Sequence, residues 1–222
     1  MMHDMEKTLV RTRVVLADQV CEMLKERILD QAYAPGMKLN IDALVREFAV
    51  SSTPIREALA RLAAEGLVQS APFVGFAVAA LPGKRYYEDL YAFRTVIEPW
   101  AAAEAAKRRT DAVIAVLREA VNAMQRGSLS RRYRKNRSFT EADDRFHRAI
   151  IGASGNVVAL RSYADLRVHL HTSRLFINRE QDAGETATEH RAILDTIAAG
   201  QPEAAAQAMR RHLRQSRQRL ID

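Results

Sequence analysis

The chain of 222 residues contains 48% hydrophobic and 27% charged residues, a balance typical of globular rather than disordered proteins. Only nine glycines and six prolines, among many Ala, Leu, Arg and Glu, favour helix over sheet. No apolar run approaches the ~20 residues that cross a bilayer, and the first 13 residues lack the apolar core of a secretory signal. The single cysteine, Cys21, fits a reducing compartment. We therefore expect a cytoplasmic protein with no membrane partner and no disulfide framework.

The net charge of +7 is unevenly distributed along the chain. Residues 1–81 hold nine basic and ten acidic residues, a net charge of −1, whereas residues 82–222 hold 25 and 17, a net charge of +8. Because the excess lies in the second half, bulk charge does not locate a DNA-binding surface.

The N-terminal part predicts two helices separated by a turn. Apolar residues at helical spacing indicate a first helix over residues 14–31, after which Pro35-Gly36 form a turn that leads into a short extended segment. A second helix is expected over 41–48, with Asn40 as its N-cap.

The stretch SSTPIREALARLAAEGLV, residues 51–68, predicts a third helix that starts near Thr53 and stops at Gly66. Two β-prone runs, 67–70 and 76–79, then flank a turn. Three helices followed by a β-hairpin within about 70 residues predict a winged helix-turn-helix domain.

The third helix carries the candidate DNA-binding residues. A recognition helix presents its N-terminal turn to DNA, where hydroxyls of Ser51, Ser52 and Thr53 can reach phosphates. Arg56, one turn further, can reach a base edge or a phosphate, and Gly75 belongs to the turn of the wing. A plainer alternative is that the hydroxyls only cap the helix and that Arg56 pairs with an acidic neighbour. The helix before and the hairpin after favour DNA binding.

Beyond the segment LPGKR the sequence predicts helices only, which favours an all-helical bundle. The expected helices cover residues 86–109, 111–126, 138–153, 156–177, 186–199 and 202–220. The basic stretch RRYRKNR, Arg131 to Arg137, is interpreted as a solvated loop, with a contact to DNA or to the other domain as the alternative.

The fold class is therefore mostly α, with an N-terminal winged helix-turn-helix and a C-terminal helical bundle. We expect a flexible arm over residues 1–13, a DNA-binding domain over 14–81 and a linker over 82–85. The helical effector-binding and dimerisation domain is expected over 86–222.

Three histidines and one aspartate in the second half form a candidate metal site. Asp143 and His147 are four residues apart and share one helix face. His190 lies ten residues before Gly200 and His212 twelve after it, so both stand ~15–18 Å from the turn of an antiparallel hairpin. Such a set suits a divalent transition metal such as zinc. Spacing alone leaves open that the histidines are ordinary core residues.

Arg94 is a candidate clamp for an effector carboxylate, because a guanidinium holds a carboxylate in a bidentate fork. The alternative is a plain ion pair with Glu98 at i+4. Of His169 and His171, which are two residues apart, one is expected to line the pocket, and His169 is the candidate.

Two independent regions resemble one family. The stretches REAL, RL and EGLV, which begin at Arg56, Arg61 and Glu65, and AYAPGMKL before the second helix are similar to the GntR family of bacterial transcription regulators. The stretches FRTVIEPWAAAEAA, DDRFHRAI, SGN and EHRAILDTIAAGQPEAAAQAMRRHL resemble the FCD ligand-binding domain of its FadR-like subfamily.

The resemblance implies a bundle that binds a small carboxylate, often through a metal ion held by one aspartate and three histidines. Those positions correspond to Asp143, His147, His190 and His212. Zinc is the expected metal, with nickel or manganese as alternatives.

The sequence departs from the family before the recognition helix. Ser51-Ser52-Thr53 stands where the family has a hydroxyl residue, an arginine and a threonine, and Asp42 stands where some relatives have a basic residue. Fewer phosphate contacts imply a smaller salt dependence of DNA binding. Arg46 is a hypothetical compensating contact.

The predicted function is a ligand-responsive transcription regulator, with repression favoured and activation left open by the sequence. It would bind an inverted-repeat operator in double-stranded DNA as a homodimer and sense a small organic acid at the metal site. The alternatives are a metal-dependent hydrolase, because such sites with open positions activate water, and a constitutive DNA-binding dimer without an effector.

Overall fold

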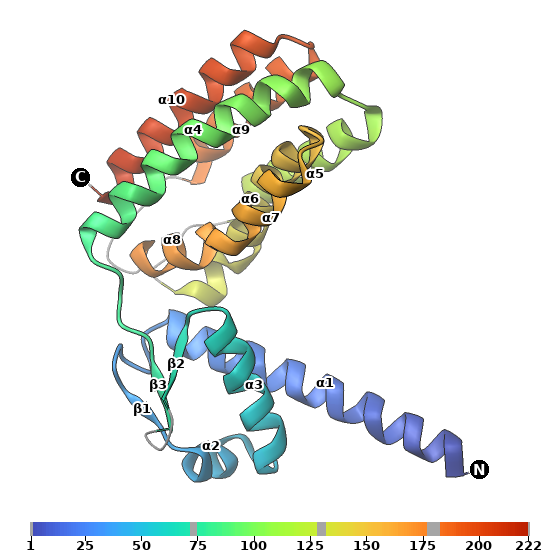
Figure 1. Cartoon of the computed structure of the whole chain (residues 1–222), viewed down its shortest axis with the longest axis vertical. Helices are drawn as coiled ribbons and strands as arrows, with labels where there is room; N and C mark the ends of the chain where they lie inside the picture. Colours follow the sequence, from blue (N-terminus) through green and yellow to red (C-terminus); the bar gives the residue numbers. More distant parts are fainter. Residues whose placement is uncertain (1, 72–74, 128–131, 177–182, 222) are drawn as a thin grey trace. The chain divides into compact units, whose positions relative to one another are not determined.

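A computed structural model describes residues 2–71, 75–127, 132–176 and 183–221 of the chain. These residues form two compact units, Met1–Leu81 and Pro82–Asp222, and each is described by itself. The N-terminal unit combines helices with a small sheet, whereas the described part of the C-terminal unit is helical throughout (Figure 1).

The N-terminal unit has the elements of a winged helix-turn-helix, which confirms the predicted fold class. In chain order they are α1 (Met2–Leu29), β1 (Lys38–Leu39), α2 (Ile41–Phe48), α3 (Ser52–Ala64), β2 (Val68–Ala71) and β3 (Gly75–Val78). The antiparallel sheet has the order β1-β3-β2, and Phe76 of β3 lies opposite Leu39 on one side and Ser70 on the other.

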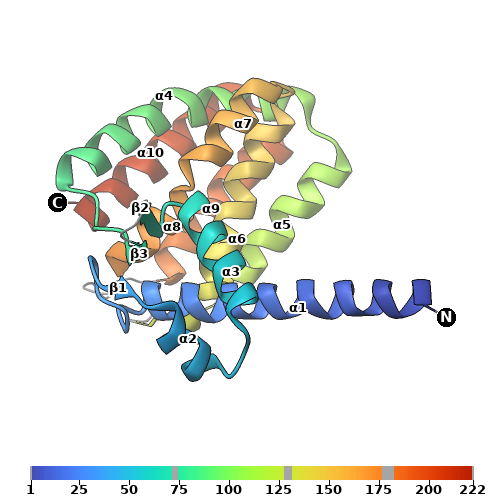
Figure 2. The ribbon, with the colours of Figure 1, turned by 60° about the horizontal axis from the view of Figure 1, so that its bottom comes forward.

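Helix α3 packs on α1 through apolar side chains at helical spacing, and Figure 2 shows the two helices crossing. Ile55, Leu59 and Leu62 of α3 and Leu24 of α1 are fully buried. An ion pair between Lys25 and Glu65, 2.8 Å long, also joins α1 to the end of α3. These contacts hold α3 against the rest of the unit.

The ends of α2 and α3 follow local sequence signals. The side chain of Asn40 accepts a hydrogen bond from the backbone N–H of Ala43 at 2.9 Å, as expected of an N-cap. Gly66 follows the end of α3 with a φ of +75°, a conformation that favours glycine. Helix α1 begins at Met2, so residues 2–13, expected from the sequence as a flexible arm, are helical.

The described part of the C-terminal unit consists of packed helices. They are α4 (Lys84–Arg108), α5 (Asp111–Arg126), α6 (Tyr133–Ala153), α7 (Val157–Leu166), α8 (Val168–Phe176), α9 (Ala183–Ala198) and α10 (Pro202–Ile221). Helices α4 and α10 run antiparallel side by side (Figures 1 and 2). Helix α6 packs on α4 and α5, and α9 packs on α10, α5 and α4. Side chains from α4, α6, α9 and α10 can therefore meet in the interior.

Two expectations for this unit are wrong. The predicted loop over the basic stretch is the first turn of α6 from Tyr133 to Arg137, while Arg131 lies outside the described residues. Basic residues are good helix formers, and Tyr133 and Asn136 are buried, so this turn has a face that packs inward. The single helix expected over 156–177 is broken at Arg167, which has a φ of +45°.

The turn between α9 and α10 sets the relative height of these helices. Gly200 has a φ of +67°, and the guanidinium of Arg109 occupies the space that a Cβ atom would need. A side chain at this position would strain the turn.

Among the described residues, no helix is long and apolar enough to span a membrane.

Candidate metal centre and DNA-reading helix

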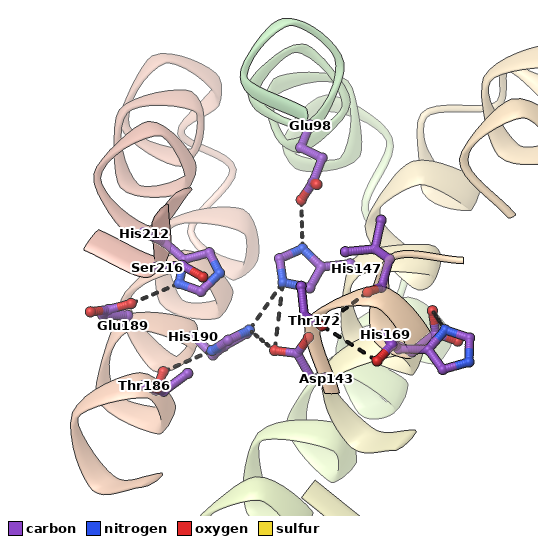
Figure 3. Close-up of polar contacts among 12 residues, drawn as sticks. Glu98, Asp143, His147, His169, Thr172, Thr186, Glu189, His190, His212 and Ser216 are labelled. Atoms are coloured by element: carbon purple, nitrogen blue, oxygen red, sulfur yellow. Dashed lines mark hydrogen bonds and ion pairs between the residues drawn. The ribbon is translucent and has the colours of Figure 1, made fainter. Parts of the chain in front are cut away.

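Three buried histidines from three helices meet in the interior of the C-terminal unit (Figure 3). His147 comes from α6, His190 from α9 and His212 from α10. One nitrogen from each ring lies within 4.8 Å of the other two, and the ring centroids are 4.4 to 5.2 Å apart. The three histidine rings therefore converge, as the positions of His190 and His212 in the α9–α10 hairpin predicted.

The Nδ1 atom of each histidine faces an acceptor outside the cluster. His147 Nδ1 lies 2.6 Å from Glu98 Oε2, and His190 Nδ1 lies 2.7 Å from the carbonyl oxygen of Thr186. His212 Nδ1 lies 2.7 Å from Glu189 Oε2. Because a carbonyl and a carboxylate only accept, a neutral imidazole at each position would carry its proton on Nδ1 and leave the lone pair of Nε2 for a metal ion.

The Nε2 atoms of the histidines are directed toward one another. Those of His147 and His190 are 3.2 Å apart, so with both protons on Nδ1 their lone pairs would face each other. Two facing lone pairs repel unless a cation lies between them. Outer acceptors that fix the ring tautomer are the usual surroundings of metal-ligating histidines. The donor set therefore fits a divalent metal ion.

Asp143 approaches the same point from α6. Its Oδ1 atom lies 3.1 Å from His190 Nε2 and 3.8 Å from His147 Nε2. Burial raises the pKa of Asp143, but the three histidines outweigh burial and hold the pKa below its usual value. All four residues predicted from the sequence as metal ligands thus lie together.

The protonation state of His212 suits a metal ligand. Burial lowers its pKa, and the neighbouring His190 lowers it further, to about 3. A neutral imidazole at physiological pH is the form that binds a metal ion.

Arg94 forms the i+4 ion pair that the sequence left open. Its Nε atom lies 2.5 Å from Glu98 Oε1, and both side chains are buried. Burial raises the pKa of Glu98, but Arg94 and His147 outweigh burial and lower the pKa to about 2. Arg94 also lines the cavity described next, so an effector contact by Arg94 stays a prediction.

A cavity adjoins the histidines and opens onto Asp143 and His212. Its walls come from α4, α6, α8, α9 and α10 and include the polar residues Tyr91, Arg94, Thr140, Thr172, Ser216 and Arg219. His169 does not belong to the described lining and lies apart from the three histidines in Figure 3. Its Nδ1 atom is 3.1 Å from Asp144 Oδ1, so this geometry does not support its predicted effector role.

Sequence reasoning missed the residues that orient the histidines. Glu98 was visible only as a partner of Arg94, and Glu189 only as the sequence neighbour of His190. Glu189 instead accepts hydrogen bonds from His212 and, at 2.6 and 2.9 Å, from Arg219. Nothing in the linear spacing indicates these contacts, because they join different helices.

In the N-terminal unit, the candidate DNA-binding residues gather at the start of α3. Ser51, Ser52, Thr53 and Arg56 are all exposed. Ser51 is the N-cap residue, but its hydroxyl makes no capping hydrogen bond. For Ser51, the structure therefore does not support the alternative that the hydroxyl only caps the helix.

Both candidate arginines have exposed side chains. Arg46 in α2 and Arg56 in α3 are exposed, and neither has an ion pair with any residue that the structure describes. Gly75 begins β3 with a φ of +93°, and it is exposed. An exposed helix start with unpaired arginines is suited to contacts with phosphates and base edges.

Family comparisons agree with this arrangement. Residues 16–78 match the model of the gntR family of bacterial regulatory proteins, and residues 89–215 match the model of the FCD domain. The chain belongs to the GntR family, with an FCD domain.

Similar proteins are regulators as well. The GntR chain is 32% identical over 195 residues to an uncharacterized HTH-type transcriptional regulator of Streptomyces ambofaciens, covering 86% of this chain and 79% of that protein. It is 28% identical over 225 residues to the galactonate operon transcriptional repressor of Escherichia coli, covering 91% and 96%. Similarity to such proteins identifies a transcription regulator and not an enzyme.

Solved structures share the fold of this GntR regulator. E. coli McbR/YncC matches with a TM-score of 0.65 at 22% identity, covering 90% of this chain and 94% of that one. A GntR regulator from Rhodococcus sp. RHA1 matches with a TM-score of 0.67 at 21% identity, covering 92% and 97%.

Proposed function

We propose that this GntR regulator binds an inverted-repeat operator as a homodimer and changes its DNA affinity when a small carboxylate binds at a metal ion in the FCD domain. Asp143, His147, His190 and His212 would hold the ion. The single observation that supports the site best is that all three Nδ1 atoms have outer acceptors while the Nε2 atoms face inward.

Zinc suits three imidazoles and a carboxylate best, with nickel or manganese as alternatives. A bound ion of this kind supplies a positive charge to which an organic acid can bind. Glu98 would orient His147, and Glu189 would orient His212. The organic acid would bind in the adjoining cavity beside Asp143.

DNA binding is assigned to the exposed start of α3. In a dimer, two such helices would enter successive major grooves of an inverted repeat. Arg56 would contact a base edge or phosphate, and the hydroxyls of Ser51, Ser52 and Thr53 would contact phosphates. Arg46 and Gly75 would add contacts beside the recognition helix and at the wing.

The proposed direction of control is repression that the effector relieves. Two similar proteins are named as repressors, of a galactonate operon in E. coli and, probably, of a D-xylose utilization operon in Paenarthrobacter nicotinovorans. By linkage, effector and operator then change each other's affinity by the same factor, typically ~5–150-fold.

Operator binding in the presence and absence of metal tests the proposal. An operator is selected from random duplex DNA, and its affinity is measured with metal-loaded protein across a panel of carboxylates. We expect at least one acid to weaken binding more than fivefold, and His147→Ala to lose both the metal and this response while still binding DNA. Operator affinity that no acid changes would instead indicate a constitutive DNA-binding protein.

A further inference from the structure

Helix α10 has an exposed face made of arginine and glutamine alone. From residue 207 to residue 221 the helix contains no acidic residue, and every exposed position is one of these two types. The exposed residues are Gln207, Arg210, Arg211, Arg214, Gln215, Arg217 and Gln218. We call the four arginines the arginine face. It presents four positive charges on one side of a helix whose other side is buried in the bundle.

The arginine face is not neutralised within the described part of the chain. No ion pair or side-chain hydrogen bond with a described residue is formed by Arg210, Arg211, Arg214 or Arg217. Other helices of the bundle differ. In α4, Arg85 pairs with Asp89 one turn away, and in α6, Arg137 pairs with Glu141. Such pairs are usual on a solvated helix face, and α10 has no acid on this side to form them.

The arginines also repel one another. Arg214 is four residues after Arg210 and three before Arg217, so the three side chains are neighbours on the helix surface. Like charges at this spacing destabilise a helix. The helix dipole favours positive charge only near the last turn, and all four arginines lie before that turn. A face that is unfavourable in the free protein indicates a partner that supplies negative charge.

Duplex DNA has the charge and the dimensions to be this partner. Arg210 and Arg217 are seven residues apart, ~10.5 Å along the helix axis. A duplex carries about one phosphate per 1.7 Å of its axis, hence about six over this length. The duplex therefore offers more phosphates than the face has arginines. Arginine suits such contacts because its guanidinium can donate two parallel hydrogen bonds to phosphate oxygens.

The distribution of charge between the two units favours the same partner. Residues 1–81 carry a net charge of −1 and residues 82–222 a net charge of +8, of which the arginine face supplies four. The exposed start of α3 offers one arginine, Arg56, beside three hydroxyl residues. Because only residues 79–83 connect β3 with α4, DNA held by one unit is at a high local concentration for the other.

We propose that the arginine face of α10 binds the phosphate backbone of the duplex that the N-terminal unit reads, independently of base sequence. This inference rests on the proposed operator binding, and it depends neither on the metal site nor on an effector. The arginine face adds affinity and salt dependence, whereas α3 supplies the sequence preference.

A charge-matched pair of triple variants of the full chain tests the proposal. The α10 variant combines Arg210→Gln, Arg214→Gln and Arg217→Gln, which remove three charges and keep good helix formers. The control variant removes three exposed arginines of α5 and α7 that have no ion pair with a described residue. It combines Arg118→Gln, Arg126→Gln and Arg161→Gln. Both variants therefore have the same net charge.

Fluorescence anisotropy measures binding to the selected operator and to a duplex of random sequence at several salt concentrations. The α10 variant is expected to bind both duplexes at least tenfold more weakly, by the same factor. Its slope of log K against log salt should become shallower by about 0.9 for each phosphate contact that is lost. The control variant should keep the slope of the wild type. Equal losses in the two variants would mean that only net charge matters and would overturn the inference.

The remaining outcomes separate this inference from the proposed function. If the wild type binds neither duplex, operator binding fails together with the inference. If the α10 variant binds both duplexes as the wild type does, only the inference fails. A change in its sedimentation in that case would assign the arginine face to a contact between two copies of the chain.

The DNA-free protein gives an independent readout. Because Arg214 has like charges on both sides of it along the helix, Arg214→Gln is expected to raise the melting temperature at low salt. Arg118→Gln should leave it unchanged, since no charged residue lies three or four positions from Arg118. A lower melting temperature for Arg214→Gln would give Arg214 a structural role and contradict the inference.

Discussion

At the residue scale, the site depends on carboxylates that never touch its centre. Glu98 contacts both Arg94 and His147, and Glu189 contacts both Arg219 and His212. Each acid thus joins an arginine to a histidine ring, so the orientation of the rings and the charge balance around them depend on the same groups. The four predicted ligands were visible in the sequence because helical spacing brings them to one height. Glu98 and Glu189 were not, since their roles depend on contacts between helices.

Glu98→Gln tests this dependence. The amide keeps the size but not the charge, so it holds the Nδ1–H of His147 less strongly, and metal affinity is expected to fall by about 10–100-fold. Arg94 also loses its buried counter-charge, which is expected to cost about 3–5 kcal/mol of unfolding free energy. Competition with a chelator measures the first effect and urea denaturation the second.

Glu119→Gln is the matched control, because Glu119 is 69% exposed and lies 3.5 Å from Arg145 on the surface. It should change neither quantity by a measurable amount. Wild-type metal affinity in Glu98→Gln would show that Glu98 does not orient His147.

At the element scale, helix ends were predictable where a local signal marks them. Helix α2 begins after its N-cap Asn40, as expected, and α5 covers the expected residues 111–126. The start of α6 was missed because the packing of Tyr133 and Asn136, and not a capping residue, extends the helix. The break at Arg167 was missed because neither glycine nor proline marks it.

Helix α3 should carry sequence-specific DNA recognition. Arg56→Ala is expected to weaken operator binding by about 1–3 kcal/mol, the range of a specific arginine–base contact. Fluorescence anisotropy with the selected operator measures it, and Arg118→Ala, on the exposed side of α5, is the control. Unchanged affinity for Arg56→Ala would place recognition elsewhere.

Ser52 occupies the position where the family commonly has an arginine, and it is exposed at the start of α3. Ser52→Arg should add one phosphate contact, so the slope of log K against log salt should become steeper by about 0.9. Titrations at several salt concentrations give the slope. A slope equal to that of the wild type would mean that this position does not face the phosphates.

At the scale of the whole molecule, the order of a winged helix and a helical bundle was predictable because each part carries its own local pattern. The cavity was not, since five helices contribute its walls. Buried ionisable groups in the bundle also couple its stability to pH. The folded-state pKa of His212 is about 3, below the ordinary 6.5, because of burial and the neighbouring His190. The unfolded chain therefore takes up the proton first.

This contribution to stability is fully present above pH 6.5 and is lost as the pH falls toward 3. Calorimetry of the metal-free protein should show the melting temperature of the bundle decreasing below pH 6.5. His212→Gln, which carries no titrating group at this position, should show a shallower decrease. Identical pH dependence of the two proteins would contradict the assignment.

The central claim is that three imidazoles and Asp143 enclose one metal ion, and anomalous diffraction from crystals of the metal-loaded protein tests it most directly. We predict a single strong anomalous peak about 2.0–2.1 Å from the Nε2 atoms of His147, His190 and His212, with Asp143 as a further ligand. No peak between these rings, with the imidazoles turned away from one another, would contradict the account.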